Sequence, residues 1–187
     1  MADSKKNIIV KSRELFEQYG YQKTTLTDIA KSLGKVKSAI YYYFSGKEEI
    51  FAELVKVEAA DFLEKLTTEV KKETTPIAQL ESYVNTRVDL MEKVAKKYHF
   101  LKKEFFELIP IVEENRIECD AAEVMFLTQI LQENKVDDPS FKANLLMQSL
   151  KGLEVQMYVT DKVQSHVKDR NAFVNFMLNG VLSNLKS

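Results

Sequence analysis

Residues 35–44, which read Lys-Val-Lys-Ser-Ala-Ile-Tyr-Tyr-Tyr-Phe, combine side chains that can contact DNA. In a helix, Ile40 and Phe44 lie one turn apart and face inward together with Val36. The residues on the outward side, where the small Ala39 permits close approach, are Lys37, Ser38, Tyr41 and Tyr42. Lysine donates to guanine or phosphate, serine pairs with either kind of base edge, and an aromatic or methyl surface contacts a thymine methyl group. The segment is therefore a candidate DNA-reading helix.

The residues before this segment predict a second short helix and a corner. Thr25 to Asp28 has the form of a capping box, an apolar stripe follows it, and Gly34 ends the stripe. Two short helices separated only by Gly34 and Lys35 are typical of a helix-turn-helix, whose second helix enters the DNA major groove. An apolar pattern that ends at Gly20 predicts a first helix that braces this pair.

Hydroxyl and ammonium groups around these helices are candidates for phosphate contacts, which set the register on DNA rather than sequence preference. Thr25 and Thr27 open the second helix, and Lys47 follows the third. Lys35 either adds a phosphate contact or is simply a solvated lysine.

The run of Tyr41, Tyr42 and Tyr43 cannot be buried as a whole. Successive helical residues point about 100° apart, so three consecutive side chains cannot all pack on one side. We therefore expect at least one of them to face solvent or DNA.

More than a dozen positions of residues 8–51 resemble the N-terminal domain of TetR-family transcriptional regulators. They are Phe16, Gly20, residues 24–30 (TTLTDIA), Gly34, residues 40–44 (IYYYF) and residues 47–50 (KEEI). The resemblance implies that residues 36–44 form the recognition helix, that Tyr41 and Tyr43 touch DNA, and that Lys47 contacts a phosphate. It also implies a dimer and a small, fairly hydrophobic effector. Binding of that effector would change the distance between the two DNA-binding domains, so that both cannot engage the operator.

The corner departs from the usual pattern of that family. Family members usually read Gly-Val-Ser-Lys-Gly where this chain reads Gly-Lys-Val-Lys-Ser, so Lys35 replaces an apolar residue and Val36 replaces the capping serine. A missing hydroxyl cap costs about 1 kcal/mol of local helix stability, which tertiary packing can offset. DNA binding is compatible with this exchange.

Composition restricts the fold and the compartment. The 187 residues include only five glycines and three prolines, too few for the many tight turns of a sandwich or barrel. No apolar run approaches the length of a membrane span and the first residues lack a secretory signal pattern, so we expect a cytoplasmic protein without a membrane partner. Residues 1–50 carry nine basic and six acidic side chains, against 18 and 22 in the remainder, which favours a polyanionic partner for the first part.

Apolar periodicity divides the chain into a helix-turn-helix domain over residues 1–46 and a helical domain over residues 47–187. The second domain begins with a long helix near 47–73. We expect further helices near 76–97, 100–109, 110–134, 139–160 and 168–185, with prolines at three of their starts. The predicted fold class is all-α: an N-terminal three-helix helix-turn-helix DNA-binding domain followed by a larger helical ligand-binding and dimerisation domain.

Apolar stripes in the last two predicted helices are a candidate dimer surface, because helix-turn-helix proteins usually present two copies to a two-fold operator. The candidate interface residues are Phe141, Leu145, Gly152, Leu153, Phe173, Met177, Gly180, Val181 and Leu185. The resemblance implies a four-helix bundle built from these helices of both subunits. The alternative is that both stripes are buried within one subunit.

Aromatic and thioether side chains of the second domain are candidates for an effector cavity, although at helical spacing an ordinary core is the stronger expectation. Arg87 lies among them on an otherwise apolar stripe and either anchors an anionic ligand or pairs with a carboxylate. The candidate effector residues are Tyr83, Arg87, Met91, Phe105, Phe106, Met125, Phe126, Met157 and Tyr158.

Catalytic and metal-binding motifs do not occur in the sequence. His99, His166 and Cys119 are far apart, and no Gly-rich phosphate loop or Gly-x-Ser-x-Gly elbow is found. We expect no enzyme activity, metal or cofactor. The sequence favours a homodimeric transcriptional repressor that binds a double-stranded DNA operator and a small effector. The alternative is an all-helical protein-interaction or ligand-sequestering module with a vestigial DNA-binding head.

Overall fold

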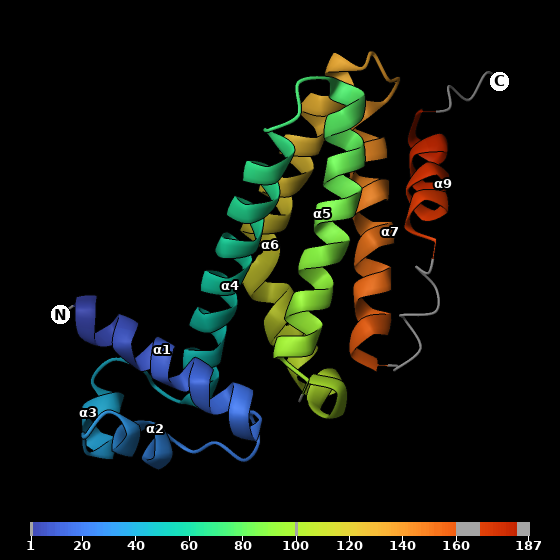
Figure 1. Cartoon of the computed structure of the whole chain (residues 1–187). Helices are drawn as coiled ribbons and strands as arrows, with labels where there is room; N and C mark the ends of the chain where they lie inside the picture. Colours follow the sequence, from blue (N-terminus) through green and yellow to red (C-terminus); the bar gives the residue numbers. More distant parts are fainter. Residues whose placement is uncertain (1, 100, 160–168, 183–187) are drawn as a thin grey trace. The chain divides into compact units, whose positions relative to one another are not determined.

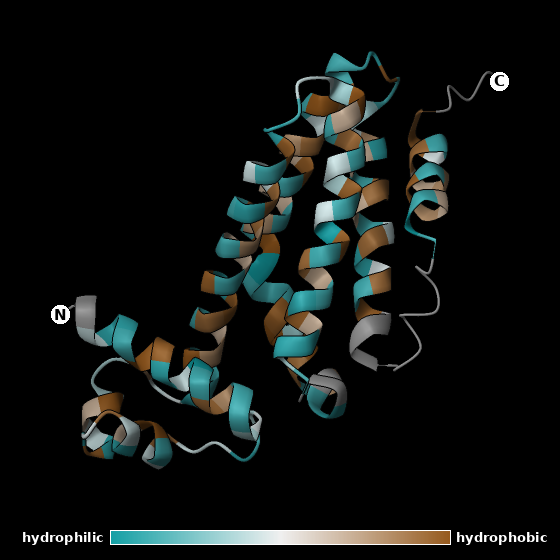
Figure 2. Ribbon diagram, viewed as in Figure 1, coloured by the Kyte–Doolittle hydropathy of each residue, from teal (hydrophilic) through white to brown (hydrophobic). Residues whose placement is uncertain are grey.

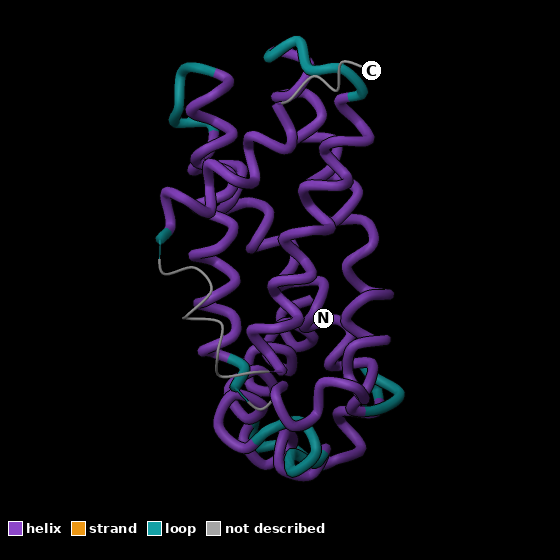
Figure 3. Tube along the Cα trace, turned by 90° about the vertical axis from the view of Figure 1, so that its right-hand side faces the viewer, coloured by secondary structure: helices purple, strands orange, loops and turns teal. Residues whose placement is uncertain are grey.

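The computed structural model describes residues 2–99, 101–159 and 169–182, and this part of the chain consists of helices joined by short loops (Figures 1 and 3). The helices are α1 (Ala2–Tyr19), α2 (Leu26–Ser32), α3 (Lys37–Tyr41), α4 (Lys47–Val70), α5 (Pro76–Lys97), α6 (Leu101–Glu133), α7 (Pro139–Val159) and α9 (Arg170–Leu182). The predicted all-α fold class is confirmed. The chain separates into two compact units, Met1–Ala59 with Lys97–Ile117 and Ala60–Lys96 with Glu118–Ser187. The predicted domain boundary near residue 46 stays a prediction.

The first unit places α2 and α3 beside each other, with α1 passing along them (Figure 1). Its core consists of side chains that are almost completely buried: Ile8, Phe16, Ile29, Ile40, Phe44 and Ile50. Phe16, Tyr21 and Phe51 form an aromatic cluster with ring centroids 5.1 to 5.8 Å apart. These contacts fix the short helices, which are too short to be stable in isolation.

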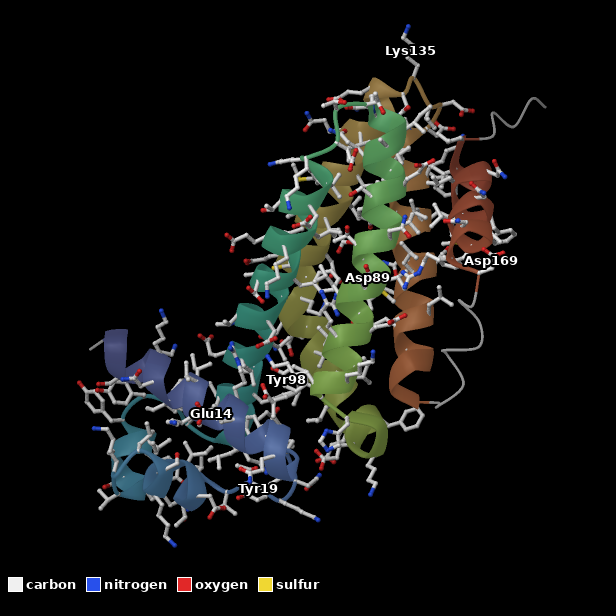
Figure 4. The ribbon with its side chains drawn as sticks, in the orientation of Figure 1. Glu14, Tyr19, Asp89, Tyr98, Lys135 and Asp169 are labelled. Atoms are coloured by element: carbon white, nitrogen blue, oxygen red, sulfur yellow. The ribbon has the colours of Figure 1, made fainter. Side chains whose placement is uncertain are left out.

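Charged groups also connect helices within the first unit. The Nζ atom of Lys97, at the end of α5, lies 3.1 Å from Glu58 of α4 and 3.3 Å from Glu17 of α1. Arg13 forms a second ion pair with Glu58 at 2.9 Å. Tyr98, which Figure 4 labels, is buried beside them, and burial together with the carboxylates of Glu58 and Glu17 raises the pKa of its hydroxyl group.

The second unit buries one apolar side of each of five helices, α4, α5, α6, α7 and α9. Apolar and polar residues recur around these helices in the pattern of amphipathic helices (Figure 2). Fully buried members of this core include Leu66, Leu80, Val84, Leu127 and Leu150. Each such aliphatic side chain contributes about 1.5 to 3 kcal/mol of favourable transfer free energy.

The last described helix, α9, is attached by both apolar and charged contacts. Val174, Leu178 and Val181 of α9 belong to the core of the second unit. Arg170, at the start of α9, forms an ion pair of 3.0 Å with Asp89 of α5, which is labelled in Figure 4.

The predicted break at Pro110 is wrong. In place of helices near 100–109 and 110–134, the structure has one helix, α6, with Pro110 inside it. An interior proline costs about 3 kcal/mol, because it removes one hydrogen bond and crowds the preceding turn. Leu108, two residues before it, is fully buried, and this packing offsets part of the cost. The other predicted helices agree with the structure within a few residues, where residues are described.

Candidate DNA-binding surface and effector site

Helix α2 begins with the capping box predicted from its sequence. The Thr25 hydroxyl accepts a hydrogen bond from the backbone N–H of Asp28 at 3.2 Å, and the Asp28 carboxylate accepts the backbone N–H of Thr25 at 3.0 Å. The Thr25 hydroxyl also donates to the same carboxylate at 2.6 Å. These hydrogen bonds lower the pKa of Asp28, the one from the hydroxyl most strongly. Thr25 and Thr27 are both exposed at the start of α2.

The corner between α2 and α3 is a Schellman motif. The backbone N–H of Lys35 bonds to the carbonyl of Ala30 at 2.9 Å, and that of Gly34 bonds to Lys31 at 3.0 Å. Gly34 has a φ of +64°, a left-handed conformation that favours glycine. The corner therefore forms with its glycine in the expected place, although the residues that follow differ from the usual pattern.

Helix α3 separates a buried side from an exposed side. Ile40 and Phe44 are buried, as their spacing predicts, while Lys37 and Ser38 are exposed. The prediction that Val36 faces inward is wrong, because 70% of this residue is exposed. Val36 precedes the first helical residue and makes no side-chain cap. The regular helix is shorter than the predicted 36–44 and spans Lys37–Tyr41.

The three tyrosines occupy different environments, as helical geometry requires. Tyr41 and Tyr42 are exposed at 51% and 72%, and Tyr43 is half-buried. The rings of Tyr42 and Tyr43 meet edge to face with centroids 4.8 Å apart. The Nζ atom of Lys37 lies 5.4 Å from the centre of the Tyr41 ring, within the range of a cation–π interaction. Lys37 and Tyr41 thus present a joined cationic and aromatic surface.

Lys47 is engaged within the protein rather than extended into solvent. Its Nζ donates to the carbonyl oxygen of Tyr21 at 2.7 Å and lies 4.1 Å from the centre of the Tyr21 ring. Burial lowers the pKa of Lys47, and the carboxylates of Glu104 and Glu107 partly oppose that effect. The expected phosphate contact of Lys47 stays a prediction, and it requires the side chain to leave Tyr21.

Two acidic residues near the start of α6 hold the loop between α1 and α2, and sequence reasoning did not find them. Glu104 accepts the backbone N–H groups of Tyr21 and Gln22 at 3.1 and 3.2 Å. Glu107 accepts a hydrogen bond from the Gln22 side chain. Their separation of more than 80 residues from that loop leaves no local sequence signal.

In the second unit, Tyr83, Arg87 and Met91 form a buried stripe on α5, and Arg87 is completely inaccessible to solvent. Glu123 of α6 accepts hydrogen bonds from the Tyr83 hydroxyl at 2.7 Å and from Arg87 Nε at 2.6 Å. A second carboxylate, that of Glu154 on α7, lies 3.9 Å from Arg87 Nη1. The stripe is therefore polar at its centre.

The electrostatics of this cluster follow from its burial. Burial acts to lower the pKa of Arg87, but the carboxylate of Glu123 outweighs it and the pKa is raised. Burial also raises the pKa of Tyr83 well above its ordinary value. The Nη2 atom of Arg87 has no hydrogen-bond partner among the described residues. Arg87 therefore pairs with a carboxylate, which is one of the alternatives that the sequence left open.

The other candidate effector residues differ in their surroundings. Phe106 and Met125 lie on the surface, at 83% and 73% exposure, and so do not line an interior cavity. Phe126 is partly buried against the core of the second unit. The side chains of Phe105, Met157 and Tyr158 lie outside the described part of the chain.

The candidate dimer residues divide between the surface and the core. Those on the surface are Phe141, Leu145, Gly152 and Gly180. Those that pack within the subunit are Leu153, Phe173, Met177 and Val181, and Leu185 lies outside the described residues. Part of each predicted stripe is thus internal, which is the alternative that the sequence left open.

Three other features bear on function. In the described part of the chain, no group of three His, Cys, Asp or Glu side chains has the arrangement of a metal site. Among the helices that the structure describes, none combines the length and apolarity that spanning a membrane requires. A surface groove of about 300 Å³ in the second unit is lined by Lys65, Glu69, Thr86, Asp89, Leu90 and Lys93, none of which is a candidate effector residue.

Comparison with known proteins identifies relatives of the first unit. Residues 8–54 match the family model described as "Bacterial regulatory proteins, tetR family". The fatty acid metabolism regulator protein of Bacillus subtilis is 29% identical over 84 residues, which cover 45% of this chain and 43% of that protein. The IcaR negative transcriptional regulator of the biofilm operon icaADBC of Staphylococcus aureus is 44% identical over 52 residues, 28% of each chain. The chain thus spans less than half the length of these curated relatives.

Solved structures extend the likeness of fold to the whole chain. A TetR-family transcriptional regulator from Pectobacterium atrosepticum superposes with a TM-score of 0.79 over 98% of this chain and 96% of that one. The two sequences are only 16% identical, so this likeness concerns the fold alone.

Proposed function

This chain belongs to the TetR family of bacterial transcriptional regulators, and from that premise we propose that it is a homodimeric repressor released from its operator by a small hydrophobic or amphipathic effector. The N-terminal helix-turn-helix binds DNA in this family. The curated relative IcaR is named a negative regulator, which supports repression as the direction of control.

The observation that carries the proposal is the two-sided construction of α3. Ile40 and Phe44 are buried, whereas Lys37, Ser38 and Tyr41 reach solvent from one short helix. A helix that served only to pack would not need this exposed aromatic and cationic surface. We propose that α3 enters the major groove, where Lys37 and Ser38 bond to base edges and Tyr41 to Tyr43 contact bases or backbone.

Phosphate contacts are proposed for the residues around α3. The exposed hydroxyl of Thr27 and the exposed ammonium groups of Lys35 and Lys37 are free to approach the DNA backbone. The Thr25 hydroxyl is already bonded to Asp28. We therefore propose that Thr25 supports phosphate binding in two ways, by fixing the start of α2 and by offering its hydroxyl group.

The test is DNA binding by the purified full-length protein to the region upstream of its own coding sequence, measured at several salt concentrations. Phosphate contacts give a linear decrease of log K with log salt, and specific contacts give a preference over shuffled duplex. Lys37→Ala and Ser38→Ala are expected to reduce that preference. A protein that binds both duplexes equally would support the alternative of a ligand-binding or interaction module with a vestigial head.

The effector is proposed to bind in the second unit near Tyr83, Arg87 and Met91. Because Arg87 already pairs with Glu123, an anionic effector would have to bond to Nη2 or displace the carboxylate. The Bacillus subtilis relative is named for fatty acid metabolism, which supports testing amphipathic acyl compounds first. A thermal-shift screen followed by release of bound DNA is the direct measurement.

Dimerisation is proposed through the exposed apolar residues of α7, Phe141 and Leu145, together with the exposed faces at Gly152 and Gly180. A side chain added at either glycine meets no atom within 4 Å in the single chain, so these positions are open to a partner helix. Two copies would match two operator half-sites about 34 Å or a multiple of that distance apart.

A further inference from the structure

Val36 is the most exposed aliphatic side chain among the described residues before residue 60. Its exposure of 70% compares with 38% for Val10 and 43% for Val57. It sits directly before α3, with φ −87° and ψ 154°, and its carbonyl accepts the backbone N–H of Ala39 at 3.0 Å. A β-branched apolar residue at this position leaves the helix without a side-chain cap, which lowers helix stability.

The corner explains why Val36 does not turn inward. In a Schellman motif the residue two after the end of the helix commonly makes an apolar contact with the last turn, and here that residue is Lys35. Lys35 is exposed, and the apolar side chain stands one position later, outside the reach of that contact. Nothing described in the first unit covers the valine.

The neighbours of Val36 leave this residue exposed at the N-terminal end of α3. Lys37 lies along the helix toward Tyr41, with its Nζ 5.4 Å from that ring. Ser38, the next residue, is short and exposed. Val36 is therefore an exposed aliphatic group on a surface that otherwise carries cationic, polar and aromatic side chains.

We propose that Val36 is a specificity-determining residue that contacts the C5 methyl group of a thymine in each operator half-site. Of the four bases, only thymine presents a methyl group in the major groove, so a solvent-exposed aliphatic side chain on a DNA-reading surface gains free energy there and at no other base. The inference rests on the proposed DNA-binding function and goes beyond it by naming one residue, Val36, and the base that it contacts, thymine.

The test removes the two contacting groups separately. A duplex is first selected from random sequences with the full-length wild-type protein, and each of its thymines is then replaced in turn by deoxyuridine, which lacks only the methyl group. Affinities are measured for wild type, Val36→Ala and Val36→Ser, the last of which restores a hydroxyl cap. Val57→Ala, an exposed valine on α4, is the matched control.

We expect one thymine per half-site at which uracil weakens wild-type binding about fourfold, the change that corresponds to burial of one methyl group, and about 16-fold when both half-sites are changed. Val36→Ser should bind the thymine and uracil duplexes equally and Val36→Ala, which keeps one methyl group, should be less sensitive than wild type, while Val57→Ala behaves as wild type. Wild-type protein that ignores every uracil substitution, or variants that keep the full sensitivity, would overturn the proposal.

Failure of the inference and failure of the proposed function give different results. Binding of wild type to the selected duplex with strong preference over a shuffled one establishes specific DNA recognition whatever uracil does. Absence of any selected sequence overturns both. Circular dichroism melting of the Val36 variants is expected to match wild type or, for serine, to exceed it, because residue 36 is on the surface.

Discussion

The ammonium group of Lys47 lies 2.7 Å from the carbonyl oxygen of Tyr21 and 4.1 Å from the centre of its ring. Lys47 begins α4, whereas Tyr21 belongs to the loop between α1 and α2, so one side chain connects the two. A lysine in this position stabilises the first unit.

Replacing Lys47 with methionine is therefore expected to destabilise the protein. Loss of the hydrogen bond and the cation–π contact should cost about 1 kcal/mol of unfolding free energy, because the group is partly exposed. If Lys47 leaves Tyr21 to contact a phosphate in the complex, as its position predicts, the slope of log K against log salt for DNA should also decrease by about 1. Urea unfolding and salt-dependent anisotropy measure the two quantities, with Lys72→Met as a surface control. An unchanged slope with reduced stability would contradict the phosphate contact and leave Lys47 with its contacts to Tyr21 alone.

Glu104→Gln is expected to loosen the loop between α1 and α2. The carboxylate accepts two backbone N–H groups, those of Tyr21 and Gln22, and charge-assisted hydrogen bonds are about twice as strong as neutral ones. Amide hydrogen exchange at these two residues should be faster in the variant, with about 1 to 2 kcal/mol lost. Glu107→Gln is the matched control, because Glu107 accepts from the Gln22 side chain and not from either of these amides, and both amides should stay protected. Equal exchange in the two variants would contradict the assignment.

Acid should weaken the start of α2 through Asp28. Hydrogen bonds from Thr25 lower the pKa of Asp28 below its ordinary value of 3.8. The native state then holds the proton less tightly than the unfolded state, so the stabilisation is complete above about pH 4 and is lost as the pH falls through the lowered pKa. Thermal melting from pH 6 to pH 3 should show wild type above Asp28→Asn at the higher pH and the difference decreasing once the pH falls below about 4. A difference that persists unchanged at pH 3 would argue against this linkage.

The first fifty residues could be interpreted further from sequence than the rest, for a physical reason. Capping at Thr25, the glycine turn at Gly34 and the buried pair Ile40 and Phe44 are local features, each set by residues within one or two turns. Val36 was misjudged because helical periodicity was extended to a residue outside the helix. The fold of the corner, set by backbone hydrogen bonds to Ala30 and Lys31, decides its direction instead.

Contacts between residues far apart in the chain could not be predicted from local sequence patterns. The hydrogen bond between Glu104 and the α1–α2 loop could not be predicted, because no local sequence pattern around Glu104 indicates a contact with a residue 83 positions earlier. A proline locally indicates a helix start, whereas α6 continues through Pro110. The division of the α7 and α9 stripes between core and surface likewise depends on packing that periodicity alone does not specify.

The buried pair of Arg87 and Glu123 should prove costly to break from one side only. Arg87→Met leaves the Glu123 carboxylate buried with the Tyr83 hydroxyl as its remaining donor, and such single removals cost about 3 to 5 kcal/mol. The double variant Arg87→Met with Glu123→Gln is expected to lose less than the sum of the single variants. Chemical unfolding of all four proteins gives the coupling free energy, and strictly additive losses would show that the pair does not act as a unit.

Leu145→Glu tests the proposed dimer. Leu145 and Phe141 are exposed one turn apart on α7, so a carboxylate at position 145 would be solvated in a monomer but desolvated against a partner helix. Light scattering should therefore report a dimer for wild type and a monomer for the variant. Because a monomer binds only one half-site, operator affinity should fall by at least 100-fold, the order of gain that linking two binding modules provides.

The control for this variant is Ile77→Glu, an equally exposed aliphatic position on α5. It introduces the same charge and should leave both the mass and the operator affinity of the wild-type dimer unchanged. If Leu145→Glu remains dimeric, the interface does not include this part of α7, since burial of a carboxylate against a partner helix would cost too much free energy for the dimer to persist. The exposure of Phe141 and Leu145 would then have another explanation, and a dimer that binds two operator half-sites would have to form through another surface.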